Sequence, residues 1–224
     1  MTVKSLWLVL KCALEVVDYY EDNSGKRIGI DFFVWLHAIA AAHADSYELR
    51  KDLGPATRTF TLRLNKLLDA GITPVFVIDG ASTGAKASVN LARAGKRAEK
   101  LEEAKRYHDA GSKAEAKKAA ASAIKITEEF IYHIVHTVLR PRGIAYLRAP
   151  GEADGQLVAL LQEGFIDAID TVDGDLIAHG ATLVYSKVSY QSGKCVRYRS
   201  DAWSSQVPPG QAQAEAIWVC IIFH

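Results

Sequence analysis

The chain has 224 residues, 49% of them hydrophobic and 24% charged, which is enough for one α/β domain with a substantial core. No apolar run approaches the roughly 20 residues that a membrane helix needs, and residues 1–20 lack the small-residue cleavage site of a signal peptide. The three cysteines (Cys12, Cys195 and Cys220) are too few and too far apart for a disulfide framework or a zinc site, so the sequence predicts a reducing compartment.

The net charge of +1 is unevenly distributed along the chain. Between residues 86 and 125, eleven Lys or Arg residues stand against five acidic ones, a local balance of +6. The remainder of the chain is therefore acidic. A basic segment beside an acidic remainder predicts one surface for polyanions and another for cations.

Hydrophobic periodicity and turn residues predict alternating strands and helices along the chain. Residues 1–20 fit an amphipathic helix interrupted by Lys11 and Glu15. The elements predicted after it are a strand over 26–31, a helix over 32–44, a helix over 57–70 that stops at Gly71, a strand over 74–79, helices over 85–139 broken at Gly111 and Ser112, a strand over 143–147, a helix over 152–163, a strand over 165–173, short strands over 182–186 and 194–198, and a final helix over 211–223.

This alternation, with strands rich in Ile and Val, predicts an α/β fold with a mostly parallel central sheet covered by helices on both faces. The stretch over 85–123 is rich in Ala, Lys and Glu and is expected to be an insertion that projects from the sheet. Because the sequence ends in the apolar run AIWVCIIFH, we expect the natural domain to continue past His224.

Six acidic residues are predicted to meet at one edge of the sheet, because ligands bind beyond the carboxyl ends of parallel strands. They are Asp31, Asp79, Asp173 and Asp175 at or just past strand ends, and Glu152 and Asp154 at the start of a helix. Taken singly, each has an ordinary explanation, since acids are favoured in a first helical turn and Asp is common in turns. Six together would repel one another, however, and that density of hard oxygen ligands suits Mg²⁺ or Mn²⁺.

The spacing within this set favours two ions. Glu152 and Asp154 are two residues apart, as are Asp173 and Asp175, which places both side chains of a pair on one side of an extended or turn segment. Two such pairs with two single acids suit two Mg²⁺ ions about 4 Å apart, the geometry for in-line displacement at phosphorus.

Basic residues begin seven positions after Asp79. Lys86 and Arg93 share a helix face, and Arg97 and Lys100 extend it, so these cations are expected to grip a phosphate beside the acids. The alternative is a solvated helix held by pairs such as Lys96–Glu99 and Glu102–Arg106.

His37 lies six residues after Asp31, on the helix predicted over 32–44. It is suited to stack on a nucleobase, or it is a histidine satisfied within the fold. The neighbouring Phe32 and Trp35 are expected to belong to the core rather than to a ligand site.

Three motifs in this order resemble the 5′ nuclease family of flap endonuclease, exonuclease 1 and the xeroderma nuclease. IGIDFFVWLH resembles the first metal-binding strand, and its -WLH ending is most similar to exonuclease 1. PVFVIDG resembles the second strand, and APGEADGQLVALLQEGFIDAIDTVDGDLIAHG resembles the long internal nuclease motif. The resemblance runs from the N-terminus to the last predicted helix.

The resemblance implies a PIN-like 5′ nuclease core over 1–224 that hydrolyses DNA at 5′ ends or flaps in repair or replication. It implies that the six acids hold two Mg²⁺ ions, with Mn²⁺ able to substitute, and that Lys86 and Arg93 are the catalytic phosphate-gripping pair. His37, Arg97 and Lys100 would contact DNA, and the helices over about 85–139 would form an arch for a 5′ single strand. The resemblance also implies that the enzyme is nuclear and monomeric and that it binds repair or replication proteins.

Three departures from the family pattern stand out. The chain begins Met1-Thr2-Val3 where the family has Met-Gly-Ile, and Val172 stands where an acid usually precedes Asp173. The family also has a further metal-binding Asp and a helix-hairpin-helix that grips the duplex, which would follow His224 and are absent from this chain.

These departures keep a second hypothesis open: a weak or inactive protein of the same fold that binds DNA ends or flaps. A third hypothesis, a metal-dependent phosphatase, rests on the motif DGDLIA alone. No nucleophile motif accompanies it, and its Asp-x-Asp follows a later strand rather than an opening one.

Overall fold

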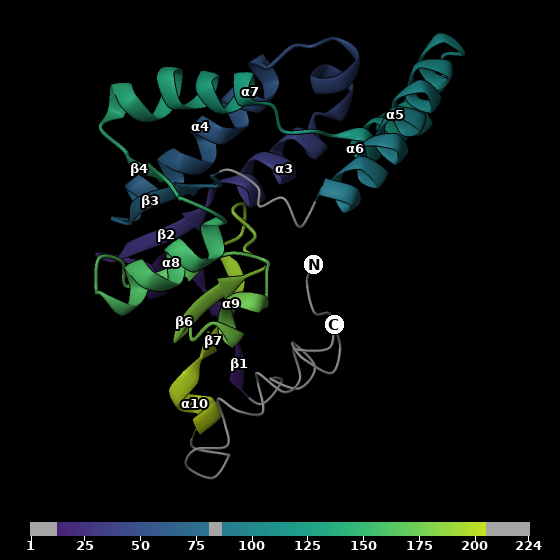
Figure 1. The fold of residues 1–224 in the computed structure, drawn as a ribbon. Coiled ribbons are helices and arrows are strands. Elements are labelled where there is room, and N and C mark those ends of the chain that lie inside the picture. Colours follow the sequence, from purple (N-terminus) through teal and green to yellow (C-terminus); the bar gives the residue numbers. More distant parts are fainter. Residues whose placement is uncertain (1–12, 81–86, 205–224) are drawn as a thin grey trace. The chain divides into compact units, whose positions relative to one another are not determined.

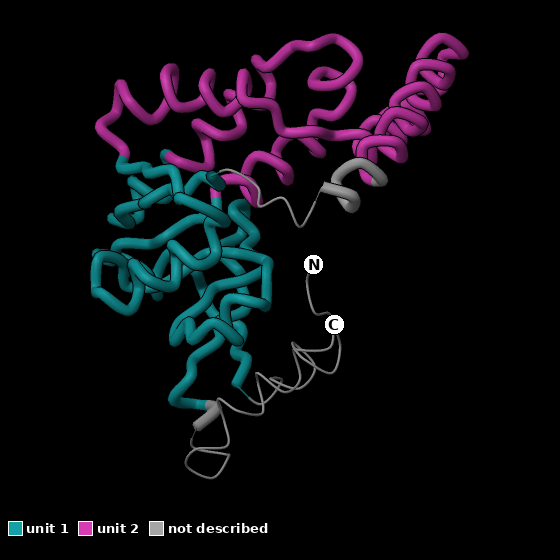
Figure 2. The backbone as a smooth tube through the Cα atoms, in the orientation of Figure 1, with its two compact units in different colours: residues 1–31, 65–80, 145–224 teal, residues 32–64, 81–144 magenta. Residues whose placement is uncertain are grey.

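The computed structural model describes residues 13–80 and 87–204, which fall into two compact units (Figure 2). The first, here called the sheet unit, comprises residues 1–31, 65–80 and 145–224. The second, the helical unit, comprises residues 32–64 and 81–144. Within the described residues, no helix has the length and apolar character to span a membrane.

A single seven-stranded sheet forms the sheet unit, in the spatial order β1-β7-β6-β5-β2-β3-β4 (Figure 1). Its strands are β1 (Leu14–Asp18), β2 (Arg27–Asp31), β3 (Thr73–Ile78), β4 (Ala145–Arg148), β5 (Ala168–Asp170), β6 (Leu183–Ser186) and β7 (Lys194–Arg199). The four pairings among β4, β3, β2, β5 and β6 are parallel, and β7 pairs antiparallel with both β6 and β1. The predicted α/β fold with a mostly parallel sheet is confirmed.

One helix packs closely on the central strands because a glycine lets it approach. α8 (Ala153–Gln162) places Leu157 in a buried cluster with Ile166 and Ile169. A Cβ on Gly29 of β2 would lie 2.4 Å from Ile166 Cδ1 and 2.8 Å from Leu157 Cδ2. Gly29 is therefore the residue type that this helix–sheet contact requires.

The prediction of an N-terminal helix over residues 1–20 is wrong for residues 14–18, which the structure describes. Residues 14–18 form the edge strand β1, and α2 (Tyr19–Asn23) follows, capped by the Asp18 side chain. Strand β1 pairs in register with β7, with Val16 opposite Val196. The adjacent β-branched residues Val16 and Val17 suit a strand, and this long-range pairing overrides the helical pattern. Residues 1–12 lie outside the described residues.

Helices make up the helical unit. They are α3 (Phe32–Ala42), η2 (Asp45–Leu49), α4 (Gly54–Asp69, which crosses into the sheet unit at residue 65), α5 (Ala87–Asp109), α6 (Lys113–Ala123), α7 (Glu128–Ile134), η4 (Val135–Leu139) and η5 (Arg140–Arg142). Phe32 and Trp35 are buried and pack edge-on against Phe60, as expected for core residues. α5 and α6 form a hairpin that turns at Gly111, whose φ of 75° is in the left-handed region (Figure 1).

Two predicted boundaries are wrong. The helical stretch after Gly111 breaks a second time at residues 124–127, where Thr127 accepts a hydrogen bond from the Phe130 backbone and starts α7. The strand expected over 165–173 is reduced to β5, because residues 172–174 leave the ladder to form a turn. The short helices α9 (Asp175–Ala178) and α10 (Ser200–Ser204) complete the sheet unit, and the helix expected over 211–223 lies outside the described residues.

Candidate metal centre

All six predicted acids belong to the sheet unit. Asp31 ends β2 and is 8% exposed, and Asp79 directly follows β3. Because side chains alternate along a strand, Asp31 lies on the same face as Gly29, the face that α8 covers. The parallel pairing of β2 with β3 brings the ends of both strands to one edge, as the sequence predicts.

Asp79 is held against the start of α8 by a close backbone approach. Its Oδ1 accepts a hydrogen bond of 2.7 Å from the Ala153 backbone N–H, so the carboxylate satisfies one of the free donors at the helix start. The next residue, Gly80, donates its N–H to the Gly151 carbonyl at 2.7 Å. A Cβ on Gly80 would lie 2.1 Å from the Ala149 oxygen, so only glycine fits there. The same local packing places Glu152 at the N-cap of α8 and Asp154 in its first turn.

Asp173 and Asp175 are presented by a hydrogen-bonded turn after β5. The Asp173 N–H donates to Thr171 Oγ1 at 3.2 Å, and the Asp175 N–H donates to Asp173 Oδ1 at 3.1 Å. Asp175 then starts α9. The two carboxylates are therefore fixed by the backbone of a short segment rather than by the strand itself, which is a correction to the predicted strand end.

The pKa of Asp154 shows that the acids interact electrostatically with one another. Burial raises the Asp154 pKa most, followed by the charges of Asp31, Asp173, Asp79 and Glu152, and together they bring it to about 7. Five of the six predicted acids are thus electrostatically coupled around one side chain. A cation among them would relieve the repulsion, which is the behaviour expected of a divalent metal site.

The residues present fit Mg²⁺ in their chemistry. Oδ1 of Asp175 is buried and has no hydrogen-bond partner among the described residues, as a ligand oxygen reserved for a cation would be. As they stand, however, no three His, Cys, Asp or Glu side chains within the described residues are gathered into a group that could hold an ion. The ligand roles of the six acids therefore stay a prediction.

The predicted cationic residues belong to the helical unit. Arg93, Arg97 and Lys100 lie on α5, and Lys86 is outside the described residues. Lys100 forms an ion pair of 2.6 Å with Glu103, one turn along, so part of this helix has the intrahelical pairing of the alternative reading. The pairs Lys96–Glu99 and Glu102–Arg106 were the examples expected; Glu102 instead pairs with Lys105 at 2.6 Å.

His37 and Arg97 lie within electrostatic reach of each other. The pKa of His37 is lowered, first by desolvation and then by the Arg97 charge. A neutral imidazole beside a guanidinium suits stacking on a nucleobase beside a phosphate. The DNA-binding roles of both residues remain predictions.

Two features of the structure were not predicted from the sequence. A pocket of about 460 Å³ within the helical unit is lined by the Arg97 side chain, by Tyr47 and by Glu48, a buried acid paired with Lys51 at 2.9 Å. In the sheet unit, Asp170 of β5 is buried and accepts hydrogen bonds from two tyrosines. Both depend on contacts between distant segments, and only the unusual position of Asp170 within an apolar strand could have drawn notice.

Two family models match most of this chain. The XPG N-terminal domain matches residues 1–100, and the XPG I-region matches residues 143–217. Both matched regions contain predicted metal ligands.

Named relatives agree with these matches. Exodeoxyribonuclease 1 of Schizosaccharomyces pombe is 32% identical over 199 residues, which cover 89% of this chain and 34% of that protein. Exonuclease 1 of Xenopus laevis is 31% identical, covering 84% of this chain and 25% of its own length. The chain thus spans about a third or less of these relatives.

Solved structures with the same fold include the catalytic core of Rad2 in complex with DNA substrate, at a TM-score of 0.65 and 24% identity, covering 90% of this chain and 56% of that one. Human GEN1 in complex with Holliday junction DNA has a TM-score of 0.65 at 18% identity, covering 99% of this chain and 50% of that one. The predicted resemblance is confirmed: this chain belongs to the XPG family of 5′ nucleases.

Proposed function

We propose that this chain is the catalytic core of a Mg²⁺-dependent nuclease that hydrolyses phosphodiester bonds in DNA near 5′ ends or flaps. The observation that supports this proposal most directly is the electrostatic coupling of Asp154 with Asp31, Asp79, Asp173 and Glu152. Such a cluster is costly without a cation and has no evident structural purpose. Membership of a nuclease family whose relatives are named exonuclease 1 supports the same reading.

The six acids, Asp31, Asp79, Glu152, Asp154, Asp173 and Asp175, would hold two Mg²⁺ ions, with Mn²⁺ able to substitute. When bound, such ions neutralise the charge of a phosphodiester and activate water for attack on phosphorus. The chain's own carboxylates orient rather than transfer protons, since Asp79 is committed to the Ala153 N–H and Asp173 to the Asp175 N–H.

Cationic residues of the helical unit would bind the substrate. Lys86 and Arg93 grip the scissile phosphate, Arg97 and Lys100 follow the strand, and His37 stacks on a nucleotide. The helices over 85–139 form the arch for a 5′ single strand. The relatives are eukaryotic exonucleases, which supports a nuclear place in DNA repair or replication.

The decisive experiment is cleavage of a 5′ flap duplex, labelled at the 5′ end and internally, by the full chain in EDTA, Mg²⁺ and Mn²⁺. Asp79→Ala and Asp173→Ala are compared with Glu163→Gln, an exposed acid at the far end of α8. We expect metal-dependent products from the wild type and from Glu163→Gln, and none from the two Asp variants. Mononucleotides would assign an exonuclease, and short oligonucleotides a flap endonuclease.

Three outcomes would contradict the proposal. Wild-type cleavage rates in either Asp variant would separate cleavage from the carboxylates. A flap that binds tightly but is never cut in Mn²⁺ would instead assign a DNA-end-binding protein. Release of phosphate from a small phosphomonoester would favour a phosphatase.

A further inference from the structure

Asp170 occupies an uncommon place for a carboxylate. It is the last residue of β5 and is 4% exposed. Its neighbour Ile169 faces α8 in the core cluster, so the Asp170 side chain lies on the opposite face of the sheet. Its backbone pairs with Ile30 of β2, one residue before Asp31. Asp170 is thus three residues before Asp173 and beside the strand that carries Asp31, but its side chain faces away from the acids.

Two tyrosine hydroxyls hold this carboxylate from separate segments. Tyr19 of α2 donates to Asp170 Oδ2 at 2.9 Å, and Tyr190, in the turn between β6 and β7, donates to the same oxygen at 2.5 Å. Tyr19 is fully buried, and burial, followed by the charge of Asp170, raises its pKa well above the ordinary value. The Tyr19 hydroxyl therefore remains a donor at all physiological pH values. Asp170, Tyr19 and Tyr190 are called the tyrosine–aspartate cluster below.

The tyrosines are themselves fixed. The Tyr19 backbone N–H donates to the Gly193 carbonyl at 2.7 Å. The Tyr190 carbonyl accepts from the Tyr20 hydroxyl at 2.7 Å and from Lys66 Nζ at 2.9 Å. The cluster is therefore a rigid attachment point for the end of β5 and not a pair of adjustable surface contacts.

A chain of hydrogen bonds leads from this attachment to the predicted metal ligands. The Thr171 N–H continues the ladder by donating to the Tyr185 carbonyl at 3.1 Å. Thr171 Oγ1 then accepts from the Asp173 N–H, and Asp173 Oδ1 accepts from the Asp175 N–H. Any shift of β5 at residue 170 is passed directly to both carboxylates.

We propose that Asp170, held by Tyr19 and Tyr190, is a positioning residue that fixes Asp173 and Asp175 for divalent-metal binding. The inference rests on the proposed function for the identity of the metal site. The cluster touches neither metal nor substrate and acts only through the turn at 171–175. A purely structural cluster would instead change stability and leave metal affinity untouched.

The test uses the full chain with single hydroxyl deletions. Tyr190→Phe is the main variant because Tyr190 is only half-buried, and Tyr19→Phe is the second. The matched control is Tyr185→Phe, which deletes a part-buried tyrosine hydroxyl that donates to Asp22 instead; Tyr185 itself pairs with Asp170 in the sheet. Mn²⁺ affinity is measured by titration with electron paramagnetic resonance detection, and the Mg²⁺ dependence of flap cleavage is measured alongside.

We expect both test variants to weaken Mn²⁺ binding by about tenfold, at the lower end of the effect of removing groups that orient metal ligands. Half-saturating Mg²⁺ should rise in parallel, while the cleavage rate at saturating Mg²⁺ stays within about twofold of wild type. Tyr185→Phe should lower the melting temperature but leave Mn²⁺ affinity unchanged.

Unchanged Mn²⁺ affinity in both test variants, or an equal shift in Tyr185→Phe, would overturn the positioning role even if the wild type cleaves DNA. Normal Mn²⁺ binding by the wild type without cleavage would instead refute the proposed function. The positioning role would still be tested by the Mn²⁺ affinities of the variants. A wild-type chain that binds no Mn²⁺ would refute both.

Discussion

Gly80 stands where the backbone after β3 passes closest to the segment that leads into α8. We predict that Gly80→Ala lowers the free energy of unfolding by about 2 kcal/mol, because its Cβ would overlap the Ala149 oxygen and neither backbone can yield without moving Asp79. Gly155→Ala, at an exposed position of α8 where a Cβ meets open space, should raise stability by about 0.8 kcal/mol. Urea denaturation of both variants checks the opposite signs, and equal effects would contradict the account.

The raised pKa of Asp154 predicts how stability depends on pH in the absence of metal. The folded state holds the Asp154 proton to about pH 7, whereas the unfolded state releases it near 3.8. The stability of the wild type should therefore fall as pH rises from about 4 to 7. Asp154→Asn lacks this penalty, so in EDTA it should be more stable than wild type by about 4 kcal/mol at pH 8 and nearly equal to it at pH 4.

Thermal unfolding in EDTA and in Mg²⁺ measures this difference. Added Mg²⁺ should stabilise the wild type and have little effect on Asp154→Asn, because the variant lacks an anionic ligand. A variant whose advantage is the same at pH 4 and pH 8 would show that Asp154 does not titrate in this range.

The acids were predictable from the sequence because their positions follow a local rule. Asp31 and Asp79 end apolar runs that can only be strands, and strands of a parallel sheet bring such residues to one edge. Asp170 and its tyrosines could not be predicted in the same way, because Tyr19 is 151 residues away from Asp170. The loss of water around a buried carboxylate is compensated only by partners that the folded chain supplies.

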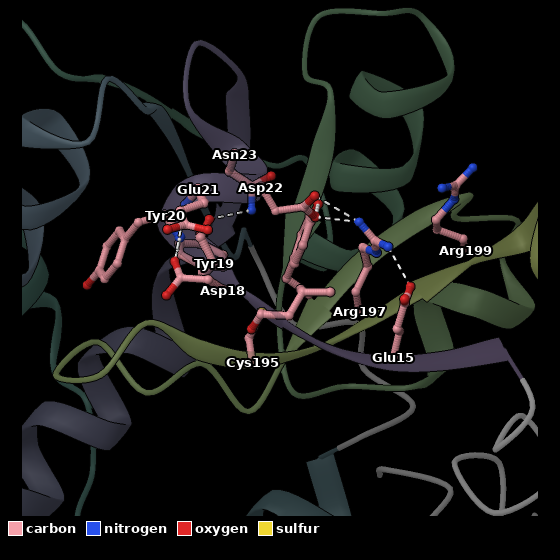
Figure 3. A network of polar contacts seen from close by, with 12 residues as sticks. Glu15, Asp18, Tyr19, Tyr20, Glu21, Asp22, Asn23, Cys195, Arg197 and Arg199 are labelled. Carbon is pink, nitrogen blue, oxygen red and sulfur yellow. Dashed lines mark hydrogen bonds and ion pairs between the residues drawn. The ribbon is translucent and has the colours of Figure 1, made fainter.

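At the scale of elements, one arginine of β7 links β1 and α2. Figure 3 shows Arg197 of β7 between Asp22 of α2 and Glu15 of β1. The Arg197 side chain is 16% exposed and Asp22 is 25% exposed, whereas Glu15 is 65% exposed. Asp22 also accepts the Tyr185 hydroxyl. The inner pair is therefore expected to carry most of the stabilisation.

We predict that Asp22→Ala lowers the free energy of unfolding by about 3 kcal/mol, because it leaves a mostly buried guanidinium without its main partner. Glu15→Ala removes an exposed partner of the same arginine and should cost less than about 1 kcal/mol. Urea denaturation of the two variants makes the comparison. Equal losses would mean that burial does not decide the strength of these pairs.

The second break in the helical stretch had a signal that the periodicity obscured. Thr127 is followed by Glu128 and Glu129, an N-cap with acids in the first turn. Residues 124–127 contain neither Gly nor Pro, so the helical pattern dominated the prediction. Strand β1 lacked even such a signal, since its pairing partner β7 lies about 180 residues later, and local propensity yields to such pairing.

On α5, Arg97 and Lys100 are predicted to differ in their contribution to DNA binding. Lys100 is already paired with Glu103, so a phosphate must compete for it, whereas Arg97 influences His37 and lines the pocket. We expect Arg97→Ala to weaken flap binding by roughly tenfold and to lower the slope of log affinity against log salt concentration by about 1. Lys100→Ala should weaken flap binding by about two- to threefold at most. Fluorescence anisotropy at several salt concentrations, in EDTA, measures both; a larger effect of Lys100→Ala would contradict this order.

For the whole molecule, the predicted metal ligands and the predicted DNA contacts belong to different units. The six acids lie in the sheet unit, and His37, Lys86, Arg93, Arg97 and Lys100 lie in the helical unit. We predict that Arg93→Ala leaves Mn²⁺ affinity within about twofold of wild type while it weakens flap binding in EDTA, and that Asp173→Ala does the reverse. Titration with Mn²⁺ and with labelled flap separates the two; joint loss in one variant would show that the sites are not independent.

The helical unit enters the chain as two inserts, residues 32–64 and 81–144, which begin directly after Asp31 and Gly80. Each insert therefore starts at the end of a strand that carries an acid. We expect that lengthening or exchanging the second insert, for example at the α5–α6 turn around Gly111, leaves the register of β2, β3 and β4 unchanged. We therefore expect exchange of one segment to change the DNA contacts proposed for the helical unit, while the acids proposed as metal ligands stay in the sheet unit.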